Sequence, residues 1–151
     1  MPFTVGVFAT ILDEQGHALL CHRRDYDYWG QPGGGLERGE TPWQGIVREV
    51  KEETGLDVAV TRLVGVYSWP SADELIFSFR CEVIGGALTL NDEARDLRYF
   101  GLDALPANLF IEHAERLRDA MDDVGTALLR EPVGPSAPEE IRLRRVAARD
   151  Q

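Results

Sequence analysis

The sequence predicts a single α/β domain, and three observations support this. The chain has 151 residues, which is enough for one domain with a sizeable core but not comfortably for two. Several runs rich in β-branched and aromatic residues indicate strands. Two segments carry apolar residues at helical spacing and indicate amphipathic helices, one near the middle of the chain and one near its end.

The first part of the chain is predicted to form strands joined by short turns. Residues 3–12 are rich in Val, Ile, Phe and Thr and indicate a buried strand. Residues 13–16 indicate a turn, and residues 17–23 a second strand. A polar and aromatic stretch at 23–29 then leads into a glycine-rich loop at 32–35.

A helix is predicted over residues 42–54, because both of its ends carry clear signals. Thr41 can cap the free backbone N–H groups, Pro42 suits the first helical position, and Gln44 completes a capping box. Gly55 supplies a C-terminal stop. The local sequence therefore predicts a loop followed by a helix of defined length.

The second part of the chain is predicted to contain further strands and a second helix. A turn at 68–73 contains Pro70. Asn108 can cap a long helix in which apolar residues recur from Ile111 to Leu128. The expected strands lie at 57–69, 75–83, 87–90 and 97–101.

The helix at 42–54 has two chemically different faces. Glu49, Glu52 and Glu53 lie at i, i+3 and i+4, so three carboxylates crowd one arc, and Arg48 relieves part of their repulsion. Either this arc is a solvated acidic face, or it is a site for a hard divalent cation with carboxylate ligands. Beside the arc runs an apolar stripe expected to be buried: Trp43, Ile46, Val47, Val50 and Thr54.

The glycines before this helix favour the cation site. Glycine lets the backbone approach a ligand closely, and a helix N-terminus favours phosphate. Gly34, Glu40 and the run 48–56 have the spacing G-x5-E-x7-R-E-U-x-E-E-x-G-U, in which U is aliphatic and is filled by Val50 and Leu56. This pattern resembles the Nudix box at every defining position. On the basis of these residues, the chain is identified as a MutT-like member of the Nudix hydrolase family.

The resemblance implies a fold and an activity. The fold would be an α/β/α sandwich around a mixed β-sheet, with the box as a loop–helix–loop, in a domain spanning residues 1–131. The activity would be hydrolysis of the diphosphate bond of a small nucleoside diphosphate derivative, with Mg²⁺ or Mn²⁺ as cofactor. Both a nucleotide sugar such as ADP-ribose and a nucleoside triphosphate remain candidate substrates. A non-catalytic nucleotide sensor on the same fold is the alternative, because fold does not fix function.

The resemblance also assigns roles to the residues of the box. Arg48 would hold and orient the glutamates, as one of the catalytic residues. Glu40 would brace the loop against the helix, and Gly55 would end that helix. The implied metal ligands are three helix carboxylates and one loop carbonyl: Glu49, Glu52, Glu53 and Gly33.

The general base stays open, because members of the family differ in where it comes from. Glu49 and Glu52 are the candidates on the helix. Glu93, six residues before Tyr99, is the loop candidate and resembles a later metal ligand or base of some members. Alternatively, Glu93 is an acidic turn residue. Its rivals as a base outside the helix are Asp92 and Glu74.

Two explanations also remain for the stretch 23–29. It is either a polar loop whose aromatic residues cover the edge of the core, or the entrance to a substrate pocket. In the second case arginines would bind phosphates and an aromatic ring would stack on a base. The candidate substrate-binding residues are Arg23, Arg24, Tyr28, Gly34 and Gly35.

Charge and composition limit the partners and the location. The net charge of -10 argues against a nucleic-acid polymer, because phosphate contacts require a basic surface. No apolar run approaches a membrane span and no basic leader is present, so a soluble cytoplasmic protein is expected. Cys21 and Cys81 are expected as buried free thiols. His17, His22 and His113 are expected to be structural or exposed.

Residues 132–151 are expected to form a charged C-terminal tail. Prolines between 132 and 138 break the chain, and the segment that follows carries several arginines. Composition alone indicates disorder or a short helix. We hypothesise that the tail packs on a second subunit, which would make the protein a homodimer. A monomer in solution whose tail is cleaved freely would contradict this.

Overall fold

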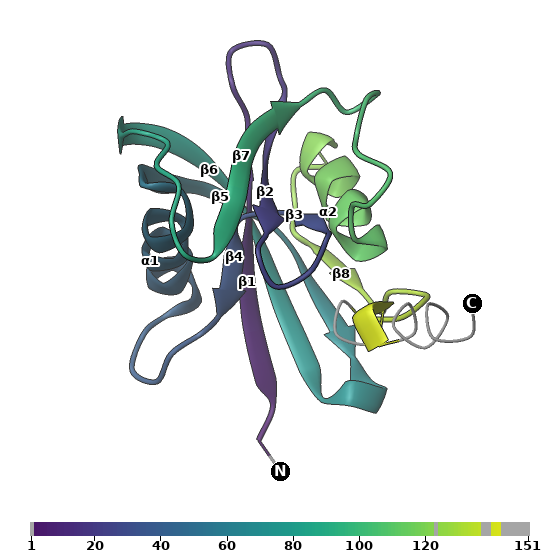
Figure 1. Ribbon diagram of the computed structural model, residues 1–151. Coiled ribbons are helices and arrows are strands. Elements are labelled where there is room, and N and C mark those ends of the chain that lie inside the picture. Colours follow the sequence, from purple (N-terminus) through teal and green to yellow (C-terminus); the bar gives the residue numbers. More distant parts are fainter. Residues whose placement is uncertain (1, 123, 137–139, 143–151) are drawn as a thin grey trace, which may run out of the picture.

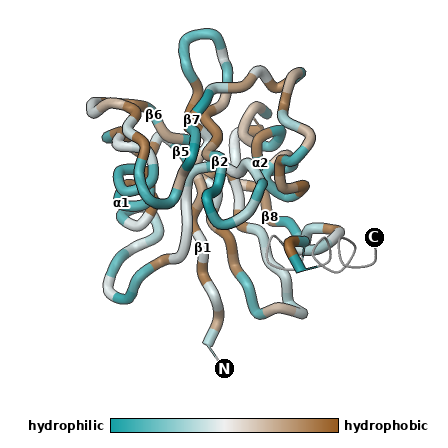
Figure 2. Tube along the Cα trace, viewed as in Figure 1, coloured by the Kyte–Doolittle hydropathy of each residue, from teal (hydrophilic) through white to brown (hydrophobic). Residues whose placement is uncertain are grey.

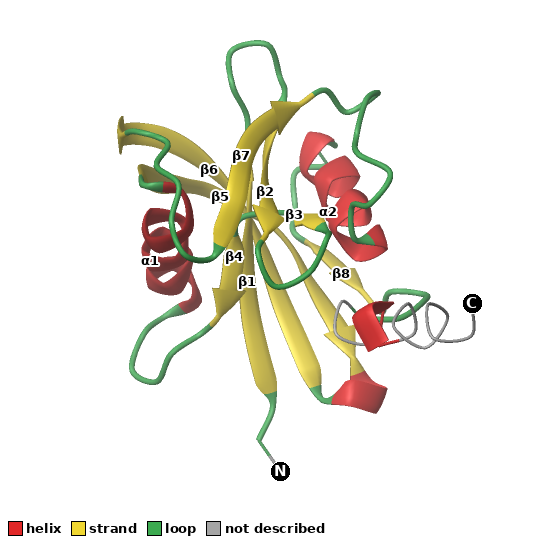
Figure 3. Cartoon of the chain, viewed as in Figure 1, coloured by secondary structure: helices red, strands yellow, loops and turns green. Residues whose placement is uncertain are grey.

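The computed structural model describes residues 2–122, 124–136 and 140–142. These residues form the predicted α/β fold, in which β-sheet lies between the helices α1 (Pro42–Thr54) and α2 (Ile111–Met121) (Figures 1 and 3). Hydrophobic residues run along the strands, and the loop between β1 and β2 is hydrophilic (Figure 2). None of the described helices is both long and apolar enough to cross a membrane.

The strands form two sheets, a five-stranded sheet of mixed direction and a three-stranded antiparallel sheet. Strand β1 pairs in parallel with β6, β5 pairs in parallel with β8, and the other pairs are antiparallel. The five-stranded sheet has the order β4-β1-β6-β5-β8, with bounds Gly33–Gly35, Thr4–Ile11, Glu74–Gly86, Leu56–Trp69 and Leu128–Arg130. The three-stranded sheet has the order β3-β2-β7, with bounds Trp29–Gly30, Ala18–Arg23 and Ala94–Phe100.

Helix α1 has the predicted bounds and caps, but its buried face is narrower than predicted. The Thr41 side chain accepts from the Gln44 N–H, the Gln44 side chain accepts from the Thr41 N–H, and Gly55 is left-handed with φ of 82°. Ile46, Val50 and Thr54 are buried as expected, whereas Trp43 is 58% exposed and Val47 37% exposed. Glu53, which is outside the predicted stripe, is also buried and accepts from the Gly33 N–H, so the buried face includes a carboxylate.

Three local predictions were wrong. Residues 32–35 are not wholly a loop, because β4 pairs with β1 across Gly33 and Phe8. A Cβ at residue 33 would collide with the carbonyl oxygen of Val7, so this pairing requires glycine. Residues 87–90 form no strand. Strand β6 instead continues through the expected break at residues 85 and 86, pairing with the start of β5.

Helix α2 differs most from the prediction. It ends at Met121, and Leu128 lies on strand β8 instead. Asn108 does not cap it but donates through Nδ2 to the carbonyl of Asp27 at 3.0 Å. Ile111 is 57% exposed, so the apolar stripe predicted for burial is partly on the outside. The buried face is largely polar and consists of Glu112, His113, Arg116, Leu117, Asp119 and Ala120.

The rest of the core consists mainly of apolar residues from the predicted strands and helices. One apolar cluster includes Val7, Leu19 and Ile46, and a second includes Leu20 and Leu117. The first lies between α1 and the sheets, and the second between the three-stranded sheet and α2. Cys21 and Cys81 are buried free thiols, as predicted.

The described part of the predicted tail contacts its own chain. Ser136 and Glu140 are buried, and a Glu140 carboxylate oxygen accepts from the Ile111 N–H at the start of α2 at 3.4 Å. Residues 137–139 and 143–151 lie outside the described residues. The boundary after residue 131 and the packing on a second subunit therefore stay predictions.

Asp119 joins α2 to the sheet, and its removal is expected to destabilise the fold. It accepts from the Tyr67 hydroxyl at 2.7 Å, and from Arg130 Nε and Nη2 at 2.7 and 2.8 Å. Asp119→Ala leaves the buried Tyr67 hydroxyl without this partner, and we expect the free energy of unfolding to fall by about 1–3 kcal/mol. Urea denaturation measures this, and Arg118→Ala on the exposed side of α2 is the control, expected within about 0.5 kcal/mol of wild type. Equal losses in the two variants would refute the role of Asp119.

Candidate active site

A cavity of about 590 Å³ brings together residues from distant parts of the chain. One group lining it is acidic and glycine-rich, and a second group is aromatic. This volume lies in the range of small-molecule sites. The first group comprises Gly33, Gly34, Glu53, Asp92 and Glu93. The second comprises Phe8, Phe110 and His113.

Glu53 is the buried carboxylate of this cavity. Its Oε2 accepts from the backbone N–H of Gly33 at 2.9 Å, so the last turn of α1 is tied to strand β4. Burial raises the pKa of Glu53 to about 7, and the hydrogen bonds from Gly33 and the Cys21 thiol only partly oppose that rise. The charges of Glu49 and Glu93 raise this pKa further. The carboxylates are therefore close enough to repel one another.

Glu49 lies against the second glycine of β4. A Cβ on Gly34 would be 2.8 Å from the Glu49 carboxylate, so a larger residue at this first position of the box would displace that carboxylate from its place. Burial raises the pKa of Glu49, and its hydrogen bond from Arg48 acts in the opposite direction. Glu49 itself does not line the cavity but touches its glycine wall.

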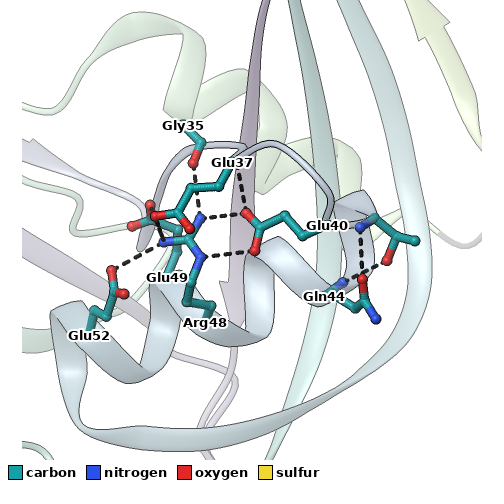
Figure 4. A network of polar contacts seen from close by, with 8 residues as sticks. Gly35, Glu37, Glu40, Gln44, Arg48, Glu49 and Glu52 are labelled. Carbon is teal, nitrogen blue, oxygen red and sulfur yellow. Dashed lines mark hydrogen bonds and ion pairs between the residues drawn. The ribbon is translucent and has the colours of Figure 1, made fainter.

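Arg48 connects the carboxylates of the box (Figure 4). Its Nε and Nη2 donate to both oxygens of Glu40 at 3.0 and 2.6 Å. Its Nη1 donates to Glu49 Oε1 at 3.0 Å and to Glu52 Oε2 at 3.2 Å. Nη2 also reaches the Gly35 carbonyl at 3.1 Å. One guanidinium thus ties the loop to the helix and draws two helix carboxylates to a single nitrogen.

Glu40 is held from two sides. Its Oε1 accepts from the backbone N–H of Glu37 at 2.8 Å as well as from Arg48. The Arg48 guanidinium and this N–H lower the pKa of Glu40 to about 2. Glu40 therefore stays ionised and fixes the turn that precedes α1.

The donor chemistry of these residues suits a hard divalent cation. The available atoms are carboxylate and carbonyl oxygens, which Mg²⁺ and Mn²⁺ prefer. The charge of Glu93 raises the pKa of both Glu49 and Glu53, and the charge of Glu49 raises that of Glu53. A bound cation would relieve this repulsion. Over the described ranges, no three His, Cys, Asp or Glu side chains are already grouped as a metal site.

The predicted substrate-binding residues divide into two sets. Arg23 and Arg24 line the cavity, as does Gly34. Arg23 makes a two-pronged ion pair with Asp25, at 2.8 and 2.6 Å. Arg24 donates from Nε to the Asn91 carbonyl at 2.9 Å. The predicted entrance at 23–29 is thus partly the wall of a cavity.

Tyr28, Gly35 and Glu52 are not on the cavity wall. Tyr28 is only 2% exposed, because its ring is covered by Phe110, with ring centroids 4.5 Å apart. Because Tyr28 lies behind Phe110 and does not line the cavity, the prediction that Tyr28 binds the substrate is corrected, and Tyr28 supports Phe110 instead. Gly35 gives its carbonyl to Arg48, and the Glu52 side chain is 51% exposed.

Asn91 organises the loop of Glu93 and was missed in the sequence. Its Oδ1 accepts from the Glu93 N–H at 2.8 Å, and its Nδ2 donates to the Glu53 carbonyl at the end of α1. The Glu93 carbonyl also accepts from the Arg24 N–H at 3.1 Å. The short run Asn-Asp-Glu at 91–93 could have signalled a side-chain-stabilised turn.

His113 and Phe110 were also missed as cavity residues. His113 is 3% exposed, and its Nδ1 accepts from the Gln31 N–H at 2.8 Å. Burial lowers the pKa of His113 well below its usual value, and the charges of Arg116 and Arg23 lower it further. The signal in the sequence was the set of polar residues along 112–119, which a surface helix explains equally well.

Because His113 is neutral in the fold but can be protonated in the unfolded chain, it makes stability depend on pH. Its folded pKa is lowered, so its contribution is complete above about pH 6.5 and is lost as pH falls towards the folded pKa. We expect His113→Asn, which cannot titrate, to lose less stability than wild type between pH 7 and pH 5. Urea denaturation at both pH values measures the difference. Parallel losses in the two proteins would contradict a buried neutral His113.

This chain is similar to known proteins in both sequence and fold. The NUDIX domain profile matches residues 2–123. An ADP-ribose pyrophosphatase of Methanocaldococcus jannaschii is 38% identical over 118 residues, covering 74% of this chain and 69% of that protein. A putative 8-oxo-dGTP diphosphatase of Bacillus subtilis is 30% identical over 118 residues, covering 78% and 79%. The crystal structure of an ADP-ribose pyrophosphatase from Streptococcus suis superposes with a TM-score of 0.71 at 26% identity, covering 87% and 100%.

An acidic, glycine-walled cavity beside a capped helix, together with these relatives, defines a hydrolase of diphosphate bonds. The chain belongs to the Nudix family, and the resemblance found in the sequence is confirmed. The predicted mixed α/β Nudix fold is confirmed as well. The protein is accordingly a Nudix pyrophosphohydrolase.

Proposed function

We propose that the cavity binds a small nucleoside diphosphate derivative, and that the box carboxylates would hold a divalent cation, Mg²⁺ or Mn²⁺, that promotes hydrolysis of its diphosphate bond by water. The observation that carries this proposal is Glu53, a buried carboxylate with a raised pKa on the cavity wall beside Gly33. The cation would be held by Glu49, Glu52, Glu53 and the carbonyl of Gly33.

The residues on the cavity wall would offset the negative charge of the diphosphate, which makes it resistant to hydrolysis. A diphosphate resists attack because its negative charges repel a nucleophile, and a bound divalent cation neutralises them and lowers the pKa of bound water. Arg23 and Arg24, both on the cavity wall, would add positive charge beside the phosphates. Catalysis then consists mainly of placement and charge stabilisation.

Among Glu49, Glu52 and Glu93, the contacts favour Glu93. It lines the cavity, whereas Glu49 and Glu52 are both engaged by Arg48. A base must lie within hydrogen-bond reach of the proton that it removes. We therefore propose that Glu93 takes the proton of the attacking water, and that Glu49 and Glu52 serve as ligands.

The substrate class follows from the two groups on the cavity wall. The acidic group would hold the cation and the diphosphate, and the aromatic group would hold a base. The relatives named above act on ADP-ribose and on 8-oxo-dGTP, so both nucleotide sugars and nucleoside triphosphates are proposed substrates. The net charge of -10 disfavours a nucleic-acid polymer. Free buried thiols accord with a cytoplasmic location, which we also propose.

A substrate panel tests this proposal. Purified protein is incubated with ADP-ribose, other nucleotide sugars, dinucleotides and nucleoside triphosphates, each with Mg²⁺ or Mn²⁺, and the phosphate-containing products are measured. We expect cation-dependent cleavage of at least one nucleotide class. If the whole panel remained intact while nucleotides still bound, the alternative of a non-catalytic nucleotide sensor would replace the enzyme.

A further inference from the structure

The geometry of His113 fixes which of its ring nitrogens carries the proton. Nδ1 faces the backbone N–H of Gln31 at 2.8 Å, and a backbone N–H can only donate. Nδ1 must therefore be an unprotonated acceptor. The single proton of the neutral ring consequently lies on Nε2. This tautomer follows from a main-chain contact, so a rotating side chain cannot change it.

The surroundings keep the ring in place. Its centroid lies 4.9 Å from that of Phe8, in an edge arrangement, and 5.1 Å from that of Phe110. Gln31 is itself fixed, since its side chain donates to the Thr10 hydroxyl at 3.1 Å and accepts from Arg116 at 3.0 Å. The charges of Arg116 and Arg23 disfavour a protonated ring.

The Nε2–H group remains available to a ligand. His113 lines the cavity, and among the described residues the one hydrogen bond of its imidazole ring is made through Nδ1. A ligand that fills the cavity would remove water from this donor, and a dehydrated donor without an acceptor is costly, so the ligand is expected to supply one. The aromatic group on the cavity wall thus contains one fixed donor.

We propose that His113 is a specificity-determining residue, whose Nε2–H donates a hydrogen bond to an acceptor on the edge of the nucleobase while the base packs beside Phe110. This inference rests on the proposed function and adds to it the group that recognises the base. A base with a ring nitrogen or carbonyl at that place satisfies the donor. A base with an N–H or amino group there leaves two donors facing each other.

A base suits this place better than a phosphate. A neutral donor between aromatic rings matches a flat, uncharged, partly apolar group. The segment from Gly30 to Gly33 gives the distance between the two groups. A Cβ on Gly30 would be 3.1 Å from the His113 ring, and the Gly33 N–H donates to Glu53. Three residues span at most about 10 Å, so a compact nucleotide can reach both groups at once.

Two substitutions separate recognition from support. His113→Gln can place an amide N–H near the position of Nε2 but has no acceptor at that of Nδ1. His113→Asn places an oxygen near Nδ1, where the Gln31 N–H needs it, but does not reach the position of Nε2. A structural role of His113 is therefore better preserved in His113→Asn, and recognition in His113→Gln. Thermal unfolding shows whether both variants fold.

The test combines these variants with altered bases. The four common nucleoside diphosphates are first compared as competitive inhibitors. The tightest is then compared with analogues that each lack one acceptor, such as the 7-deaza and 3-deaza forms of a purine. In wild type, we expect one analogue to bind about 3- to 10-fold more weakly, the usual scale of one neutral hydrogen bond.

The expected result is a coupling between one base atom and His113. In His113→Asn the parent nucleotide and that analogue should bind equally, whereas His113→Gln should keep part of the difference. KM for hydrolysis should rise more than kcat falls, because the bond is present in both ground and transition states. If each analogue lost the same factor of affinity relative to the parent nucleotide in wild type as in His113→Asn, the inference would be overturned. Wild type without hydrolysis of any nucleotide would overturn the proposed function instead.

Discussion

Glu53→Gln is expected to lower kcat by about 10²- to 10⁴-fold while the protein remains folded. Glutamine has nearly the same shape, and its amide oxygen can still accept from the Gly33 N–H that Glu53 binds at 2.9 Å. The substitution removes the negative charge that would face the cation. It also removes a charge from a buried position, so the fold should not suffer. Steady-state kinetics on the best substrate of the panel measures kcat.

A matched control separates the effect of this site from a general effect of lost charge. Glu82→Gln removes one carboxylate from an exposed position on β6, far along the chain from the box. Its kcat should equal that of wild type. Equal kcat in Glu53→Gln and wild type, with both proteins folded, would remove Glu53 from the catalytic machinery.

Arg48→Ala is expected to weaken the apparent affinity for the cation by about 10- to 100-fold, the usual cost of losing a group that orients metal ligands. Without Arg48, the carboxylates of Glu49 and Glu52 no longer accept from one shared nitrogen. Glu40 also loses both of the hydrogen bonds that Arg48 donates to it. The cation concentration that gives half-maximal activity measures this. Arg48→Lys should recover only part of the loss, because an ammonium cannot match both oxygens of Glu40 at once.

Arg38→Ala is the control for this prediction. Arg38 is an exposed arginine on the loop that precedes α1, ten residues before Arg48. Removing it subtracts the same charge and should leave the cation dependence unchanged. If Arg38→Ala shifted that dependence as far as Arg48→Ala, the effect would come from net charge rather than from the contacts of Arg48.

The parts of the fold that are decided locally were predictable from the sequence. Helix α1 begins and ends where its caps place it, because Thr41, Gln44 and Gly55 act on their own neighbours in the chain. Helix α2 was predicted too long and with a partly wrong face. Its buried side is polar because Asp119 meets Tyr67 and Arg116 meets Gln31, and these contacts exist only after the chain has folded.

The site divides in the same way. The spacing of the box placed the carboxylates and Arg48 near one another, because residues three and four apart share a helix face. The aromatic group could not be found from spacing. Phe8 lies on β1 and His113 on α2, and only the pairing of β1 with β4 and the packing of α2 bring them to one cavity. Tyr28 was misplaced because aromatic character alone does not distinguish a cavity wall from the layer behind it.

The most direct test of cation-assisted cleavage at this cavity measures hydrolysis of the best panel substrate after removal of metal by a chelator and stepwise return of Mg²⁺. Wild type should be inactive without the cation and should recover in a saturable way. Glu53→Gln should remain at least about 100-fold slower at every Mg²⁺ concentration. Full activity of wild type in the chelator, or recovery of Glu53→Gln to the wild-type rate, would contradict the account.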